Sequence, residues 1–184
     1  DLEDLYLPYR PRRRTRATIA REKGLEPLAT LITEHNQPQR PPLNLTQAAC
    51  DFVQPEQGVE TVEEALKGAA DILAEAVAEQ AELRAWVRRY FLKAGQFRAQ
   101  IDSKIPAGST KFELYRAYDV AVSKVAPHNF LALLRGQRED IVSLELAFDG
   151  EEVLRHLESQ VVHTRNADLR AFYRDLIEDA FTRL

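Results

Sequence analysis

The chain has 184 residues with 45% hydrophobic side chains, enough to bury a core without disulfide or metal staples. A single cysteine, Cys50, and the lack of any apolar run near the roughly 18 residues that span a bilayer exclude a disulfide-rich secreted domain, a multi-thiolate zinc site and a membrane protein, so we expect a cytoplasmic location. The net charge of −4 would disfavour nucleic acid if it were spread evenly.

The charge is instead strongly segregated along the chain. Residues 9–24 hold seven basic side chains against one acid, whereas residues 51–83 hold nine acids against one base. One end is therefore cationic and the middle is anionic. The chain also begins at Asp1 and contains no methionine, so we expect it to be a fragment of a larger multidomain protein.

The first 45 residues are predicted to form a basic arm followed by a helix-turn-helix lobe. The opening, LYLPYRPRRRTR, has two prolines and mutually repelling arginines, so we expect an extended arm anchored by its leucines and tyrosines. A short helix over about 15–23 ends at Gly24, and a second, with Pro27 in its first turn, runs to about His35.

A long central helical element is the clearest structural signal. After a proline-rich linker at 36–45 and a short helix near 46–53, Thr61 and Glu64 have the spacing of a capping box. Apolar residues then recur at helical period from residue 62 to Gly95, and the polar residues 79–82 mark a break between two helices.

The second half of the chain is predicted to mix helices with a small β element. Alternation within 96–108 favours a strand, and a second capping box at Thr110 and Glu113 predicts a helix that ends before Pro127. That helix would bury Phe112, Tyr115, Val122 and Val125.

Two apolar runs, 130–134 and 141–148, are predicted to form a β-hairpin, and two helices follow near 150–160 and 168–184. We expect part of the apolar stripe of the last helix to pack against domains outside this chain; the alternative is that the stripe is wholly satisfied by the central helix. The sequence thus indicates a mainly α, multi-helical fold whose body, residues 46–184, carries a small β-hairpin.

The arginine cluster is the strongest functional signal. Closely spaced guanidinium groups with few neutralising acids are suited to contact successive phosphates. The alternative is that these groups pair with the acidic central helix of the same molecule, as charge runs on protein surfaces often do. The candidate nucleic-acid-binding residues are Arg10, Arg12, Arg13, Arg14, Arg16, Arg21 and Lys23.

Catalytic chemistry finds no support in the sequence. Cys50 follows two alanines without a histidine signature, which is typical of an inert thiol. His156 and His163 are seven residues apart and would share a helix face only if the helix of 150–160 were extended, so their spacing disfavours a metal site. No glycine-rich phosphate loop is present. We therefore expect a chain that is not an enzyme and that has no cofactor and no metal.

Two blocks of sequence carry a specific resemblance. The stretch LYLPYRPRRRTRATIAREKGLEPLA at 5–29 closely resembles the segment that identifies the Tex family of bacterial RNA-binding transcriptional accessory proteins. A second block at 111–136 resembles the family's KF-x-DYF helix and PSHR-x-LA-x-x-RG turn, and the run GAADILAEAVAE at 68–79 extends the likeness. The second block departs from the pattern at Leu114, Ala126, Pro127 and Asn129.

The resemblance implies the N-terminal scaffold region of a Tex-type protein that binds nucleic acid, RNA in preference to DNA, and takes part in transcription. In the family this region precedes an RNase-H-like domain, helix-hairpin-helix elements and an OB-fold domain with the main RNA-binding surface. The expected partners are RNA, the transcription machinery and the remaining domains of the full-length protein. The competing hypothesis is a protein-interaction adaptor whose arginines dock on an acidic protein surface.

Overall fold

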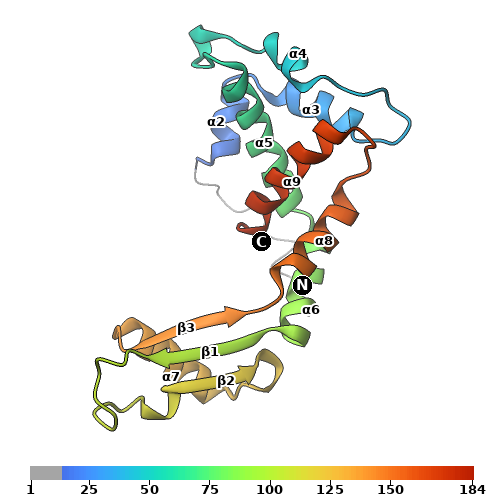
Figure 1. The fold of residues 1–184 in the computed structure, drawn as a ribbon. Helices are drawn as coiled ribbons and strands as arrows, with labels where there is room; N and C mark the ends of the chain where they lie inside the picture. The colour runs from blue at the N-terminus through green and yellow to red at the C-terminus, as the bar shows by residue number, and fades with distance from the viewer. Residues whose placement is uncertain (1–13) are drawn as a thin grey trace. The chain divides into compact units, whose positions relative to one another are not determined.

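The computed structural model describes residues 14–184, which form two compact units (Figure 1). Unit 1 comprises residues 14–84 together with 151–184, and unit 2 comprises residues 85–150. The predicted mainly α fold is confirmed, since helices make up most of the described elements and the strands form a single small sheet. The units divide the chain at other places than the boundary predicted at residue 45.

Unit 1 begins with two short helices joined by a tight turn. The helix α2 (Arg16–Glu22) is capped by Thr15, whose side chain accepts a hydrogen bond from the Thr18 amide. Gly24 follows with φ +76°, a left-handed conformation that glycine adopts without strain. The helix α3 (Glu26–His35) then carries its proline in the first turn, as predicted, and α4 (Leu45–Cys50) follows the proline-rich linker.

The long central element consists of two helices, with the break where the sequence placed it. The helix α5 (Val62–Ala78) starts at Thr61, whose Oγ1 accepts the Glu64 amide at 3.2 Å. The helix α6 (Ala81–Ala94) begins in unit 1 and continues into unit 2. Nine residues of α5 are buried, so this helix is the centre of unit 1. No helix among residues 14–184 is long and apolar enough to cross a membrane.

The last two helices return to unit 1. The helix α8 (Gly150–Val161) buries Val153, Leu157 and Val161, and α9 (Ala167–Phe181) packs against α5 (Figure 1). Part of the apolar stripe of α9 is covered by its own unit, whereas Phe172, Phe181 and Leu184 stay half-buried, so docking on other domains remains a prediction. Five of its residues are buried: Leu169, Tyr173, Leu176, Ile177 and Ala180.

A buried asparagine ties the end of α3 to the loop between α8 and α9. The Asn36 amide group donates to the Val161 carbonyl at 2.7 Å, and its oxygen accepts the amides of His163 at 2.9 Å and Thr164 at 3.2 Å. Asn36 is only 8% exposed. Three backbone groups that could not otherwise pair are thus satisfied by one side chain.

Unit 2 is a three-stranded antiparallel sheet covered on one face by a helix. The strands are β1 (Gln96–Ile101), β2 (Ala117–Ala121) and β3 (Val142–Ala147), in the order β2-β1-β3. Ala99 lies opposite Tyr118 on one side and Leu144 on the other. These side chains share a core with Phe112, Tyr115 and Leu133, the last from α7 (Pro127–Arg138).

The predicted helix after Thr110 is wrong. The Thr110 hydroxyl accepts the amide of Phe112, two residues on, instead of that of Glu113, so it closes a local turn and not a helix cap. A single 3₁₀ turn, η3 (Glu113–Tyr115), and strand β2 follow, with a second such turn, η4 (Val122–Lys124), before α7. Phe112 and Tyr115 are nevertheless buried, as expected.

The predicted β-hairpin is half right. Residues 141–148 do contain strand β3, but residues 130–134 belong to helix α7, which starts with Pro127 in its first turn. The short apolar run FLALL has no period that separates strand from helix, and the proline at the helix start decides it. The strand β3 therefore pairs with the distant β1, and the small β element is a three-stranded sheet.

We predict that replacing Asn36 with alanine lowers the free energy of unfolding by about 2–4 kcal/mol, because the substitution removes the partner of two buried backbone groups and of one partly buried group. Asn44→Ala is a matched control. Asn44 makes one exposed capping bond, to the Gln47 amide, and its loss should cost only about 1 kcal/mol. Chemical denaturation followed by circular dichroism measures both. Equal losses in the two variants would contradict the proposed role of Asn36.

Candidate nucleic-acid interface

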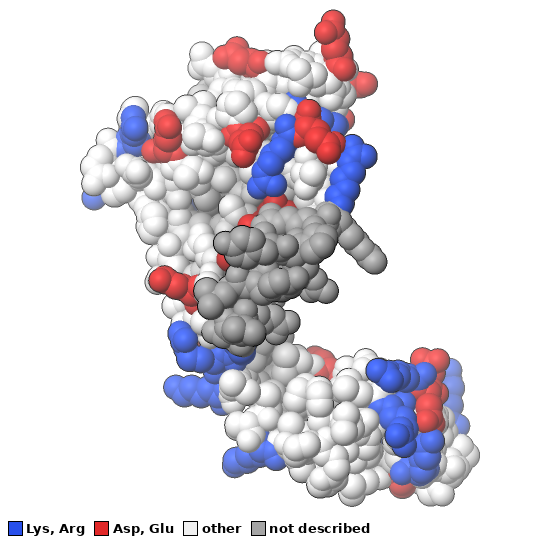
Figure 2. Space-filling model, turned by 180° about the vertical axis from the view of Figure 1, so that it is seen from behind, with Lys and Arg blue, Asp and Glu red and all other residues white. Residues whose placement is uncertain are grey.

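The predicted cationic segment continues into α2, and the structure describes only its second part, from Arg14 to Lys23. Arg10, Arg12 and Arg13 lie outside the described residues, so the structure leaves their partners open. Arg14 precedes α2, Arg16 and Arg21 lie on it, and Lys23 is its C-cap. Figure 2 shows that lysine and arginine side chains occur beside acidic ones on unit 1.

Small side chains bring α2 close to α5. The buried residues of α2 are Ala17 and Ala20, and α5 presents Ala65, Gly68 and Ala69. A Cβ atom on Gly68 would lie 2.3 Å from Leu25 Cδ1 and 3.3 Å from Ala20 Cβ, closer than atoms pack. The polar side chains at the edges of α2 therefore reach the acids of α5.

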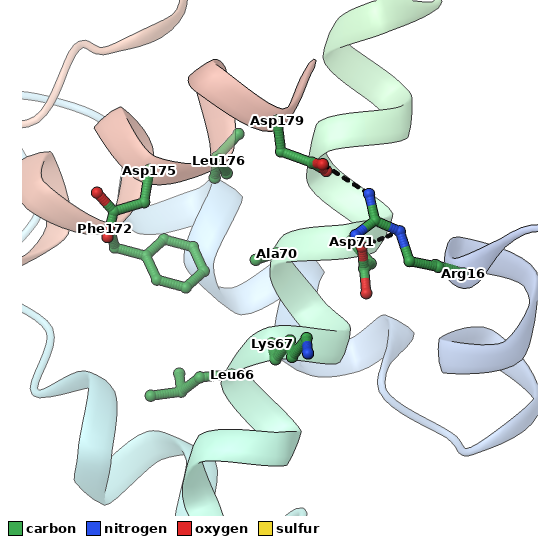
Figure 3. Close-up of a pocket in the computed structure, with 9 residues that line it drawn as sticks. All are labelled: Arg16, Leu66, Lys67, Ala70, Asp71, Phe172, Asp175, Leu176 and Asp179. Carbon is green, nitrogen blue, oxygen red and sulfur yellow. Dashed lines mark hydrogen bonds and ion pairs between the residues drawn. The ribbon is translucent and has the colours of Figure 1, made fainter. Parts of the chain in front are cut away.

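Arg16 joins three helices through an ionic network (Figure 3). Its Nη2 donates to Asp179 of α9 at 2.6 Å, and its Nε lies 3.2 Å from Asp71 of α5. Arg183 also contacts both carboxylates, at 3.0 Å for Asp71. Two cations and two anions thus alternate at the junction of α2, α5 and α9.

The network changes the titration of its members. Partial burial raises the pKa of the Asp179 carboxyl, but the hydrogen bond from Arg16 and the charge of Arg183 outweigh it, and the pKa lies below its ordinary value of 3.8. The hydrogen bond to Asp179 likewise raises the pKa of the Arg16 guanidinium. Both groups are therefore held in their charged forms.

Arg21 takes part in a second, more buried contact. Its Nη1 donates to Glu75 of α5 at 2.7 Å, and the Thr15 hydroxyl donates to the other oxygen of the same carboxylate at 2.8 Å. Glu75 is 8% exposed, so a carboxylate in the middle of α5 is held by the two ends of α2. A buried charge is tolerated only with such partners.

The two remaining cations contact the protein at its surface. Arg14 pairs with Glu22 at 2.6 Å, with both side chains more than half exposed, and Lys23 Nζ donates to the Gly58 carbonyl at 2.6 Å. Exposed pairs of this kind are worth little and exchange readily for other anions. Of the described candidate residues, Arg14 is the one most available to a phosphate.

A pocket of about 310 Å³ lies beside the Arg16 network, between α5 and α9 (Figure 3). Its apolar wall is formed by Leu66, Ala70, Phe172 and Leu176, and its polar rim by Lys67 and Asp175 with the network itself. The rim carries more carboxylates than cations, which suits a cationic or apolar group and not a phosphate.

The described residues offer little to metal or nucleophilic chemistry. Residues 14–184 contain no group of three or more histidine, cysteine or acidic side chains placed to hold a metal ion. The Cys50 thiol is exposed at the end of α4 and donates to the Thr46 carbonyl at 3.2 Å. Burial lowers the pKa of His156, so this imidazole is neutral at physiological pH.

Sequence reasoning identified the cations but missed their individual partners. Asp71, Glu75 and Asp179 lie 54 to 163 positions away from the arginines that they hold, so no local pattern connects them. The acid-rich stretch 51–83 was the available signal, and it favoured the alternative in which the arginines pair within the molecule. For Arg16 and Arg21, the structure has that arrangement.

Comparison with known proteins gives a consistent result. A family model described as Tex central region-like matches residues 40–180. The chain is 34% identical to "Uncharacterized protein YdcI" of Bacillus subtilis over 100% of its length, which is 25% of the relative. It is 34% identical to "Protein tex" of Bordetella pertussis, over 88% of the chain and 19% of the relative. It is also 34% identical to "Transcriptional accessory protein Tex" of Neisseria gonorrhoeae, over 82% and 19%. The chain thus spans a fifth to a quarter of these relatives.

We predict that Asp179→Asn destabilises the chain by about 1 kcal/mol at pH 7, because the amide cannot complete the ionic network. A carboxyl with a depressed folded-state pKa stabilises the fold above its unfolded pKa and stops doing so as pH falls through the folded pKa. The difference between wild type and variant should therefore be constant above about pH 5 and shrink below about pH 4.

Denaturation at a series of pH values measures this difference. Asp175→Asn, on the same helix and the same pocket but exposed, is the matched control and should leave the pH profile unchanged. A difference in the Asp179 variant that does not begin to shrink as the pH falls below about 4 would show that the effect is not electrostatic.

Proposed function

The chain belongs to the Tex family of transcriptional accessory proteins, and from this membership we propose that it is a helical scaffold region that binds RNA through its basic arm. The observation that carries the proposal is the division of the cationic segment. Arg16 and Arg21 are held by α5 and α9, whereas within residues 14–184 Arg14 makes only an exposed pair. The ion pairs of Arg16 and Arg21, which we call the clamp, hold α2 in place and so fix the point at which the basic arm joins unit 1.

This arrangement supports binding by Arg14 and the three arginines before it. A phosphate contact gains free energy mainly by releasing counterions, and that gain needs cations that are not already neutralised by buried carboxylates. Arg10, Arg12 and Arg13 have no acid within the first 14 residues except at 1–4, at the far end of the arm. RNA is proposed as the preferred ligand because the sequence resemblance of residues 5–29 and 111–136 to the Tex family implies RNA binding, and transcription complexes and the other domains of the full-length protein are proposed as partners.

A protein-interaction adaptor is the second candidate function. The observation in its favour is that Arg14, Arg16 and Arg21 all pair with carboxylates of this chain, which supports docking of the segment on an acidic protein surface. Neither function requires catalysis, and we propose that this chain has no enzymatic activity, no cofactor and no metal. The exposed Cys50, which bonds only to a helix carbonyl, supports that proposal.

Charge reversal tests the arm directly. Changing Arg10, Arg12, Arg13 and Arg14 to glutamate should weaken RNA binding similarly for all sequences, since phosphate contacts carry no sequence information. If all four contact a single strand, they contribute about −2.8 to the log–log salt slope, at about −0.7 per phosphate, and this contribution should disappear. Fluorescence anisotropy with single-stranded RNA at several salt concentrations measures it.

A four-fold reversal elsewhere on unit 1 is the matched control. Arg40, Arg155, Arg165 and Arg170 are all exposed, so changing them to glutamate alters the net charge equally without touching the arm. Arg16 and Arg21 are left unchanged, because their loss would disturb the fold. If the log–log salt slope becomes less steep by the same amount in both variants, or changes in neither, the result argues against RNA binding by the arm. Retained RNA binding with lost binding to an acidic peptide would favour the adaptor.

A further inference from the structure

Unit 2 is cationic within an anionic chain. Residues 85–150 carry ten lysine and arginine side chains and seven acids, a net charge of +3, while the whole chain has −4. The family resemblance and the arginine cluster direct attention to the arm, yet a second excess of positive charge lies here. Its arrangement on the surface decides whether it forms a binding site.

Unit 2 has six exposed cations that form no ion pair among residues 14–184, and two of them, Arg135 and Arg138, lie on one side of α7; the others are Arg89, Lys93, Lys104 and Lys124. His128, Leu131, Arg135 and Arg138 are exposed and follow one another at spacings of three or four residues, so they form one stripe along the helix. With a rise of 1.5 Å per residue the stripe is about 15 Å long. Lys124, four residues before His128, is also exposed and precedes the stripe. The opposite side of the helix buries Leu133 and Gly136 against the sheet.

The acids of unit 2 lie outside α7, although Glu139 and Asp140 directly follow its last residue. The segment 120–138 contains no aspartate or glutamate. Arg98 lies opposite Asp119 and Glu145 in the sheet register, on the exposed face away from the residues that α7 covers. Lys111 pairs with Glu139 at 2.9 Å, and Arg116 pairs with Glu113. The sheet face and the η3 turn are thus neutralised locally, and the solvent face of α7 is not.

The cations on α7 have no carboxylate partner among residues 14–184. Lys124, Arg135 and Arg138 form no ion pair there, unlike Arg98, Lys111 and Arg116 of the same unit. Figure 1 draws α7 behind the strands, and Figure 2, seen from behind, shows lysine and arginine side chains gathered on unit 2 with acidic side chains among them. Unneutralised cations in a row are the electrostatic footprint of a polyanion site.

We infer that the solvent face of α7, with Lys124, His128, Arg135 and Arg138, binds the phosphate backbone of single-stranded RNA. The inference rests on the proposed RNA binding and adds to it a contact surface in unit 2 that is separate in sequence from the arm. It does not require the arm to bind.

The composition of the stripe favours RNA over a protein partner. Protein interfaces have an apolar centre depleted of charge and a charged rim. Here Leu131, 66% exposed, is the single large apolar residue of the stripe, and cations lie on both sides of it. Backbone contacts of this kind are non-specific and depend strongly on salt.

A double charge reversal tests the site. Arg135→Glu with Arg138→Glu, in the full 184-residue chain, should lower affinity for a labelled single-stranded RNA 20-mer at least about tenfold at low salt. The log–log salt slope should become less steep by about 1.4, for two phosphates at about 0.7 each. Arg135→Gln with Arg138→Gln should give the same change in slope with a smaller loss of affinity. Circular dichroism and thermal melting verify that both variants are folded.

Arg165→Glu with Arg170→Glu is the matched control, since both residues are exposed in unit 1 and form no ion pair among the described residues. The control should keep the wild-type slope. If the α7 variants and the control have the same log–log salt slope for RNA binding, the inference is overturned. The proposed function survives that result if the variant with the four reversed arm arginines loses RNA binding. No RNA binding by the wild-type chain at low salt overturns both. If only the α7 variants lose RNA binding, the result supports this inference and refutes RNA binding by the arm. Loss of binding to a polyglutamate peptide, with RNA binding intact, would make α7 a protein-docking surface and overturn the inference.

Discussion

The close approach of α2 to α5 is the constraint on which unit 1 depends. It is possible because Gly68 has no side chain where Leu25 and Ala20 pack, and because the facing positions are alanines. A seven-residue helix such as α2 is too short to be stable alone, so tertiary packing must hold it. Once α2 lies against α5, its polar edges fall beside Asp71 and Glu75, and the ionic contacts follow from the packing.

This packing gives adjacent arginines in one basic segment different roles. Arg16 and Arg21 neutralise carboxylates that are 13% and 10% exposed, and removing either partner would leave a poorly solvated charge. Arg14, a few residues away, has a solvent-exposed pair that any phosphate could replace. The segment is therefore both a clamp inside the molecule and a candidate contact outside it. The two hypotheses drawn from the sequence, phosphate contact and intramolecular pairing, describe different residues of the same segment.

Local signals in the sequence were sufficient where structure is local. The Thr61 cap, the turn at Gly24 and the proline that begins α3 each fix a helix boundary through neighbouring residues, and those boundaries agree with the structure. Thr110 misled because its hydroxyl can accept either of two nearby amides, and only the burial of Phe112 and Tyr115 decides between them. The pairing of β1 with β3 and the partners of Arg16 join residues that are far apart in sequence, where periodicity carries no information.

The same argument explains why net charge is a poor guide to what this chain binds. Most of the acids in α5 that make the chain anionic lie where the fold can use them, and Asp71 and Glu75 are largely inside unit 1. A ligand responds to the charge that remains after such internal pairs are counted, because a neutralised cation releases few counterions. By that measure the stripe on α7 is more cationic than α2, although α2 has the denser arginine sequence. Misassigning residues 130–134 to a strand hid the stripe, since only a helix places His128, Leu131, Arg135 and Arg138 on one side.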